Sequence, residues 1–418
     1  MYDCAFHLGL QIRCTKGSPI LDTLDHLPPL PLFVSYKDRS LRLTVQDELG
    51  LYHALRLHDR VRHIELVLRP SILHKVLLLM DKQFPTLEHL SLSFEDELDF
   101  SNKKKPNITP RLTLPLAFRA PNLRHLALFS IDPSKRLRVL TSTVSLVTLE
   151  LRNIQTSSYS RPRLLVARLR SLPHLEELYI SFSVPIPRPS TERELLGERR
   201  TPVTLPSLKN LQFIGVSTYL ESFVAQISAP GLKELRITLF NQISFTLPHL
   251  IRLIDITEGL KLPIAAVGFD RNGVHISTVH HGSAESGWLP FFIRVNCNQL
   301  DWQIDCAAQI CHALIPALSC AEQLTLYHNY QEMTAELRNG EIESLTWQDL
   351  LRSFIGVQRL YIEPELSEEL SRALQADEVG LDSGFLPNLR SIHAEGNLFA
   401  SFIDTRQGVG LPVQFVEW

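Results

Sequence analysis

The sequence predicts an α/β solenoid, a stack of short parallel strands that alternate with helices. Two observations lead to this prediction. A phrase of the form apolar-x-x-Leu-x-Leu recurs along the chain, and segments whose apolar residues have helical spacing lie between its copies. A recurring unit of this kind is typical of architectures in which each repeat packs on its neighbours. The copies begin at Phe84, Ala120, Val144, Leu172, Leu205, Ala229 and Leu386.

Each copy predicts a short strand because apolar and polar side chains alternate in it. In the first copy Leu90 and Leu92 flank Ser91, so the core-facing residues have a period of two. Measured between the first leucines of the first six copies, from Leu87 to Leu232, the steps are 36, 23, 29, 33 and 24 residues. These steps scatter around the roughly 20–29 residues of a leucine-rich repeat, with insertions. We therefore expect a leucine-rich-repeat solenoid with irregular, degenerate repeats, its parallel strands on a concave face and its helices on a convex face.

The segments between the strands predict the helices. Residues 70–83 begin with proline and place Ile72, Val76, Leu79 and Met80 on one face. A shorter helix is expected near residues 49–58, ahead of a strand over residues 61–68. The other expected helices cover residues 161–172, 219–228, 247–260 and 300–318.

The regular pattern predicts a division of the chain. We expect an irregular N-terminal cap over residues 1–60 and a solenoid over residues 61–418. The solenoid should be regular over residues 61–260 and irregular, with longer strands, over residues 261–418. Residues 265–279 form a strand, turn and strand around Asp270 and Gly273, which predicts a hairpin, and residues 288–297 predict a further strand of the same array.

Composition excludes several classes of function. The net charge is −3 and the pI near 6.6, so no basic excess exists to bind nucleic acid or an anionic membrane. The sequence shows neither a signal-peptide pattern nor an apolar run of membrane-spanning length. Six cysteines are spread thinly and form no Cys-x-x-Cys pair. We therefore expect free thiols in a reducing compartment, the cytoplasm or the nucleus.

No motif in the sequence predicts an enzyme, a cofactor or a metal site. The glycine-rich phosphate loops, the nucleophile elbow and the zinc-binding His-Glu-x-x-His pattern are absent. His280 and His281 are adjacent but lack a carboxylate or thiol at metal-ligand spacing. Asp301 and Asp305 lie one helical turn apart, where acidic residues favour the start of a helix. We expect no catalytic, cofactor-binding or metal-binding residues.

The expected functional surface is the outward face of the strands. Leucines occupy the inward positions, so the residues between them should line the concave face, which solenoids commonly use to bind proteins. The alternative is that these are ordinary solvent-exposed strand residues without a role in binding. The candidate partner-binding residues are His89, Ser91, His125, Phe129, Glu150, Arg152, Glu177, Tyr179, Asn210, Gln212, Glu234 and Arg236.

Several stretches carry a family resemblance. The most specific is STYLESFVAQISAPGLKELRITLFNQ at residues 217–242. Further stretches lie at residues 24–36, 41–55, 59–66, 298–311 and 399–414. Together they resemble the F-box-type leucine-rich-repeat proteins of mushroom-forming fungi, and they touch most of the chain.

The resemblance implies a role in protein recognition. In that family an N-terminal F-box binds a Skp1-like adaptor, and the repeats present a substrate to a cullin ubiquitin ligase. No F-box pattern precedes Leu24, so we expect the substrate-holding half without the adaptor-binding element. The expected function is a non-enzymatic protein-interaction module. Two alternatives stay open: an enzyme with a noncanonical site near Asp301, Asp305 and His312, and a decayed structural repeat protein without a partner.

Overall fold

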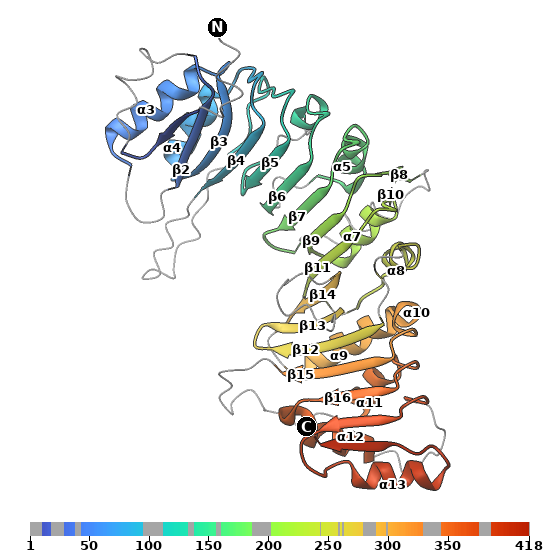
Figure 1. Ribbon diagram of the computed structural model, residues 1–418. Helices are drawn as coiled ribbons and strands as arrows, with labels where there is room; N and C mark the ends of the chain where they lie inside the picture. Colours follow the sequence, from blue (N-terminus) through green and yellow to red (C-terminus); the bar gives the residue numbers. More distant parts are fainter. Residues whose placement is uncertain are drawn as a thin grey trace. The chain divides into compact units, whose positions relative to one another are not determined.

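The chain folds into two compact units. Unit 1 contains residues 1–209 and 226–228, and unit 2 contains residues 210–225 and 229–418. Figure 1 shows both as strands accompanied by helices. The computed structural model describes residues 11–17, 29–37, 43–94, 112–132, 138–155, 160–185, 202–242, 244–257, 260, 263–278, 290–297, 300–328, 344–375 and 386–417.

Unit 1 is built on a parallel sheet whose strands pair in chain order. The predicted parallel pairing of successive copies is thereby confirmed. The strands are β1 (Ile12–Thr15), β2 (Leu32–Lys37), β3 (Val61–Leu68), β4 (His89–Phe94), β5 (His125–Phe129), β6 (Thr148–Ile154) and β7 (Glu177–Phe182). The helices are α3 (Val45–Arg56), α4 (Pro70–Leu79), η1 (Arg138–Thr141) and α5 (Pro162–Leu169), and β8 (Val203–Thr204) pairs with β10 (Ile227–Ser228).

Unit 2 also alternates strands and helices, and one of its described strands runs opposite to its neighbours. Its strand order is β9-β11-β14-β13-β12-β15-β16-β17-β18, and β13 alone among these described strands runs antiparallel to its neighbours. The strands are β9 (Asn210–Gly215), β11 (Glu234–Phe240), β12 (Ile264–Asp270), β13 (Gly273–Thr278), β14 (Phe291–Asn296), β15 (Gln323–His328), β16 (Arg359–Ile362), β17 (Ser391–Ala394) and β18 (Gln414–Glu417). The helices are α7 (Ser217–Val224), α8 (Pro248–Asp255), α9 (Leu300–Ala313), α10 (Ile315–Leu318), α11 (Ser344–Leu351), α12 (Pro364–Gln375) and α13 (Ala400–Gly408).

A tight turn introduces the strand in each copy of the phrase. The backbone N–H of the first leucine donates to the carbonyl three residues earlier, as from Leu123 to Ala120 at 3.1 Å and from Leu208 to Leu205 at 3.3 Å. Proline follows the accepting residue in several copies, and its fixed φ suits the second position of such a turn. The phrase is therefore a turn followed by a strand.

A second set of hydrogen bonds joins each turn to the previous repeat. The amide of Arg124 donates to the carbonyl of Glu88 at 2.8 Å, and that of Glu88 donates to Arg62 at 2.9 Å. Side chains in the turn add to this ladder: Asn122 donates to Pro85 at 2.7 Å and Ser207 donates to Pro173 at 2.8 Å. Buried backbone groups at the turn are thus satisfied between repeats.

The core consists of the leucines that the phrase aligns. Leu90, Leu126, Leu149 and Leu178 are paired in register and at most 1% exposed.

One helix cap in unit 2 joins two repeats. The buried carboxylate of Glu221 in α7 accepts hydrogen bonds from the first amides of α8, those of His249 and Leu250, both at 2.9 Å. This carboxylate replaces the cap that α8 lacks locally.

The structure confirms most predicted elements and corrects some boundaries. The hairpin around Asp270 and the following strand lie inside the sheet of unit 2, as predicted. The expected helix over residues 219–228 ends at Val224, because Ile227 and Ser228 pair as β10. The expected helix over residues 300–318 is interrupted at Leu314, next to Pro316 in the first turn of α10.

Strand pairing also extends into the predicted N-terminal cap. β1 and β2 join β3 in parallel, ahead of residue 61. The division at residues 60 and 260 into cap, regular and irregular parts stays a prediction. Within the described residues, no helix combines the length and apolarity that crossing a membrane requires.

The alternation of buried and outward residues can be tested in β4. Leu90→Ala should lower the free energy of unfolding by roughly 2–5 kcal/mol, because it leaves a cavity in a fully buried row. Ser91→Ala, one residue along the same strand, should change it by less than about 0.5 kcal/mol. Urea denaturation followed by circular dichroism measures both, and equal losses would contradict the inward and outward assignment.

Candidate binding surface

The candidate residues lie on the open face of each sheet, which we define as the face whose residues alternate with the buried leucines. In unit 1 the burial patterns of β4, β5 and β7 alternate as the sequence predicted. Thr148 is an exception: it occupies an outward position in register with Glu177 but is 8% exposed. Its hydroxyl donates to the Glu177 carboxylate at 3.3 Å.

A row of stacked rings runs along the open face of unit 1. The strand register places Phe33, His63, His89 and His125 side by side on β2, β3, β4 and β5. Ring centroids lie 5.4 Å apart for the first pair, 4.1 Å for the second and 5.6 Å for the third. The first two pairs are stacked within 12° of parallel. Ser91, one row further along β4, is paired with Ala127.

An arginine cluster adjoins this row on β5, β6 and β7. The Arg152 guanidinium lies 3.9 Å from the centroid of the Tyr179 ring and 5.6 Å from that of Phe129. The Glu150 carboxylate accepts a hydrogen bond from Arg152 Nε at 2.7 Å. Burial raises the pKa of Tyr179 in spite of Arg152, so its phenol stays neutral at physiological pH. The cluster brings together four of the predicted residues.

β6 has a local irregularity next to Arg152. The pairing of β6 with β7 shifts after Leu151, and Asn153 has a φ of +55°. Asparagine tolerates this left-handed conformation better than most residues. The Asn153 side chain also hydrogen-bonds with Ser130 of the neighbouring repeat. Arg152 itself stays in register with Phe129 of β5, and its guanidinium lies over the Tyr179 ring of β7.

The remaining candidates lie on the open face of unit 2. Asn210 is in register with Glu234, and Gln212 with Arg236, on β9 and β11. All four are half-buried, and Arg236 forms an ion pair with Glu234 on its own strand. The predicted outward orientation is confirmed here too. Partner binding by these residues stays a prediction.

Sequence reasoning missed a polar cluster on β12, β13, β14 and β15. Arg294 donates to both oxygens of the Asp270 carboxylate, at 2.6 and 2.7 Å. His275 is 8% exposed, and its Nε2 lies 2.6 Å from the Tyr327 hydroxyl. Its ring also stacks on Phe292 at 5.3 Å. The predicted hairpin and the strand expected after it were the available signal, because β13 of the hairpin pairs antiparallel with β14 and opposes His275 to Arg294.

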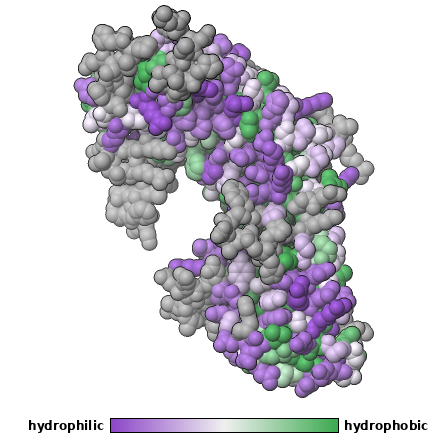
Figure 2. All heavy atoms as spheres, viewed as in Figure 1, coloured by the Kyte–Doolittle hydropathy of each residue, from purple (hydrophilic) through white to green (hydrophobic). Residues whose placement is uncertain are grey.

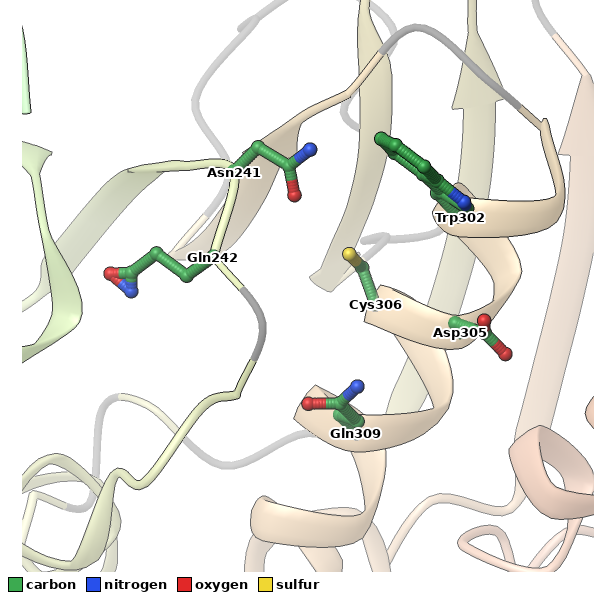
Figure 3. A pocket seen from close by; sticks show the side chains of 6 residues that line it. All are labelled: Asn241, Gln242, Trp302, Asp305, Cys306 and Gln309. Atoms are coloured by element: carbon green, nitrogen blue, oxygen red, sulfur yellow. The ribbon is translucent and has the colours of Figure 1, made fainter.

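The residues proposed for a noncanonical catalytic site are not brought together. Asp305 and His312 are exposed on α9 two turns apart, and the side chain of Asp301 lies outside the described residues. His280 and His281 also lie outside them. A pocket of about 350 Å³ is lined by Asn241, Gln242, Trp302, Asp305, Cys306 and Gln309 (Figure 3). Among the described residues, no group of three His, Cys, Asp or Glu side chains is placed to hold a metal ion.

No protein-family model matches the chain, and no curated protein matches it. Among solved structures, the leucine-rich repeat-containing protein LegL7 from Legionella pneumophila is similar at 14% identity and a TM-score of 0.30, covering 96% of this chain and 98% of that chain. The fold itself is read from this chain's own strand order and recurring turns.

Protonation of His275 at low pH should destabilise unit 2. Burial, together with Arg294, lowers the pKa of His275 to about 4, while the unfolded chain binds this proton near pH 6.5. Because the pKa of His275 is lower in the folded chain than in the unfolded chain, keeping this residue neutral makes the folded state more stable. That stability is fully present above pH 6.5 and is lost as the pH falls through about 4. We expect a loss of roughly 2–4 kcal/mol, measured by urea denaturation across this range.

The matched control for this titration is His275→Gln, which keeps a polar partner for Tyr327 but cannot gain a proton at this pH. Between about pH 6.5 and pH 4.5 its unfolding free energy should fall distinctly less than that of the unmodified chain, because the His275 proton no longer contributes. The Asp270 pKa is raised by burial, but hydrogen bonds from Arg294 and Asn272 lower it more, so its own contribution is lost at still lower pH. An unchanged slope in the glutamine variant would contradict the assignment to His275.

Proposed function

We propose that this chain is a non-enzymatic protein-interaction module that binds a protein partner on the open face of unit 1, centred on Arg152 and Tyr179. Arginine and aromatic residues dominate the energetics of protein interfaces. Phe129 is 41% exposed beside Arg152, which leaves ring surface for a partner to cover. Hydrophilic residues cover most of the coloured surface in the view of Figure 2, with apolar residues in small groups.

Prior ordering of the cluster supports this proposal. Arg152 is already fixed by Glu150 and by the Tyr179 ring, so binding orders few additional side chains. The ring row of Phe33, His63, His89 and His125 extends the surface along the sheet. Asn210, Gln212, Glu234 and Arg236 offer a further polar contact area in unit 2.

The finer proposal is that the module is the substrate-holding part of an F-box ubiquitin-ligase receptor, acting in the cytoplasm or nucleus. The stretches that resemble fungal F-box proteins support it, above all residues 217–242. If an F-box is encoded upstream of Met1, the proposal also includes binding of a Skp1-like adaptor. Sequencing the transcript upstream of Met1, and testing whether a Skp1-like adaptor co-elutes with the chain, addresses this part separately.

A second candidate is an enzyme whose site is the pocket beside α9. The observation that favours it is the presence of Asp305 and Cys306 in one pocket wall. General acid–base catalysis requires groups within hydrogen-bond reach of the same reacting atom. His312 does not line this pocket, and Asp305 is exposed. The pocket therefore gives only weak support to the enzyme hypothesis.

The proposal predicts that charge reversal at Arg152 abolishes partner capture. The immobilised chain is exposed to a lysate, and bound proteins are quantified by mass spectrometry. Arg152→Glu should lower capture of the partner at least about tenfold, because it removes a central cation and places a carboxylate beside Glu150.

The matched control is Arg170→Glu, the same charge reversal on the exposed end of α5 in the neighbouring helical segment. It should capture the partner as the unmodified chain does, as should Asp305→Asn in the α9 pocket. Equal capture by all variants, or equal loss in Arg152→Glu and Arg170→Glu, would refute a partner site at Arg152. Thermal unfolding of each variant verifies that it is folded.

A further inference from the structure

A pocket in unit 2 lies between helix α9 and the loop that follows β11. Its volume is about 350 Å³, which is within the size range of small-molecule binding sites. The described residues that line it are Asn241 and Gln242 from the loop, and Trp302, Asp305, Cys306 and Gln309 from α9 (Figure 3). The four residues of α9 follow one another at helical spacing, so they share one face of the helix. The loop and this helix face form two opposing walls.

Hydrogen bonds outside the pocket hold both walls in place. In the loop, the Gln242 side chain accepts from the backbone amide of Ser217 at 2.7 Å and donates to the Ser217 hydroxyl at 2.9 Å. In α9, the Gln303 amide donates to the carbonyls of Cys297 and Asp270, at 2.9 and 2.8 Å. Because the walls are already ordered, a ligand loses little affinity to ordering them.

Trp302 gives the helix wall an exposed aromatic surface. It is 54% exposed, whereas Trp347 of α11 is 1% exposed. Figure 3 shows the indole ring extending from the start of α9 toward Asn241. An indole ring has a large, flat apolar face, and leaving such a face in water forgoes the stabilisation that burial gives. A ligand with an apolar face of its own can cover the ring of Trp302.

Two primary amides lie beside this ring, one on each wall. Asn241 and Gln309 are both exposed, and in the part of the chain that the structure describes neither side chain forms a hydrogen bond. Figure 3 shows the Asn241 amide pointing toward α9, whereas the Gln242 side chain points away from it. A primary amide offers N–H donors and a carbonyl acceptor. A ligand stacked on Trp302 can therefore find donors and acceptors on both walls.

The charge of the pocket favours an uncharged ligand. Asp305 is the only charged residue among the described residues that line it, and Figure 3 shows its carboxylate directed away from the space between α9 and Asn241. A phosphate or carboxylate group would lose its hydration there without a cation to replace the water. Nucleotides also stack on indole rings, but they carry phosphate. The ligand that fits is thus neutral, with an apolar face and polar groups around its edge.

We propose that this pocket binds a neutral sugar in its pyranose form, either as a free sugar or as one residue of a glycan. The C–H face of the pyranose ring covers Trp302. The hydroxyl groups at its edge, which both donate and accept, hydrogen-bond with Asn241 and Gln309. The site binds the sugar without cleaving it, because glycoside hydrolysis uses two carboxyl groups that flank the bond. The described lining has one, on Asp305, and it is directed away.

Saturation-transfer NMR on the intact chain tests this proposal. The probes are the methyl pyranosides of glucose, galactose, mannose and N-acetylglucosamine, with adenosine as an uncharged aromatic comparison. We expect saturation transfer to the ring C–H protons of at least one pyranoside, and a titration then gives its Kd. Neutral glycans released from glycoproteins form a second arm. Tighter binding of a glycan than of the methyl pyranoside identifies the glycan as the ligand, and equal binding identifies the single sugar.

Single substitutions place the sugar in the pocket. Trp302→Ala should raise the Kd at least about tenfold, because it removes the stacking surface. Gln309→Ala should raise it roughly two- to tenfold through the lost hydrogen bonds. His312→Ala, exposed on α9 but outside the pocket, is the matched control and should bind as the unmodified chain does. Circular dichroism verifies that each variant is folded.

Sugar binding in unit 2 is independent of the partner site in unit 1. Arg152→Glu should therefore bind the sugar with an unchanged Kd even where it loses partner capture. Saturation transfer to none of the pyranosides or glycans would overturn the proposal. So would a Kd that Trp302→Ala leaves unchanged, tighter binding of adenosine than of any sugar, or cleavage of a glycan by the chain.

Discussion

Strand register depends on one recurrent backbone hydrogen bond, from the residue before each strand to the equivalent carbonyl of the previous repeat. In unit 1 these bonds link Arg62, Glu88, Arg124, Val147, Glu176 and Lys209 in succession, at 2.7–2.9 Å. The side-chain period of a strand is two, so a slip of one residue would turn every buried leucine to solvent. The leucine row and the open face are therefore two consequences of the same bond.

The fixed register gives the open face its chemistry. Because residues at the same position of successive strands lie side by side, three histidines in equivalent positions become a stack rather than three isolated side chains. The order breaks where β6 departs from its register, and there Arg152 crosses to Tyr179. This contact of unit 1 thus lies beside a departure from the repeat, where Asn153 adopts a left-handed conformation.

The features that could be predicted from the sequence are those that depend on the pattern within one strand or helix. Leu90 and Leu92 around Ser91 were enough to place the inward and outward faces of β4, because both depend on the period of one strand. Contacts between repeats were not accessible, because repeat lengths vary and no local pattern shows that Glu221 caps α8 or that Asn122 reaches Pro85. Helix α12 was missed although Pro364 opens it and Leu366, Leu370 and Leu374 have helical spacing, a signal that was present.

The antiparallel insertion explains how the polar cluster of Asp270, His275, Arg294 and Tyr327 forms in unit 2. β14 pairs in parallel with β11, and β12 pairs in parallel with β15, so the hairpin preserves the direction of the sheet on both sides. Gly273 is required there, because a Cβ would lie 2.0 Å from the Val295 carbonyl. Since β14 is the last of the three strands in sequence, the helix that follows it packs back over β13 and β12. That return path brings α9 against the end of β14, where the Gln303 amide donates to the carbonyls of Cys297 and Asp270, and the parallel pairing resumes at β15.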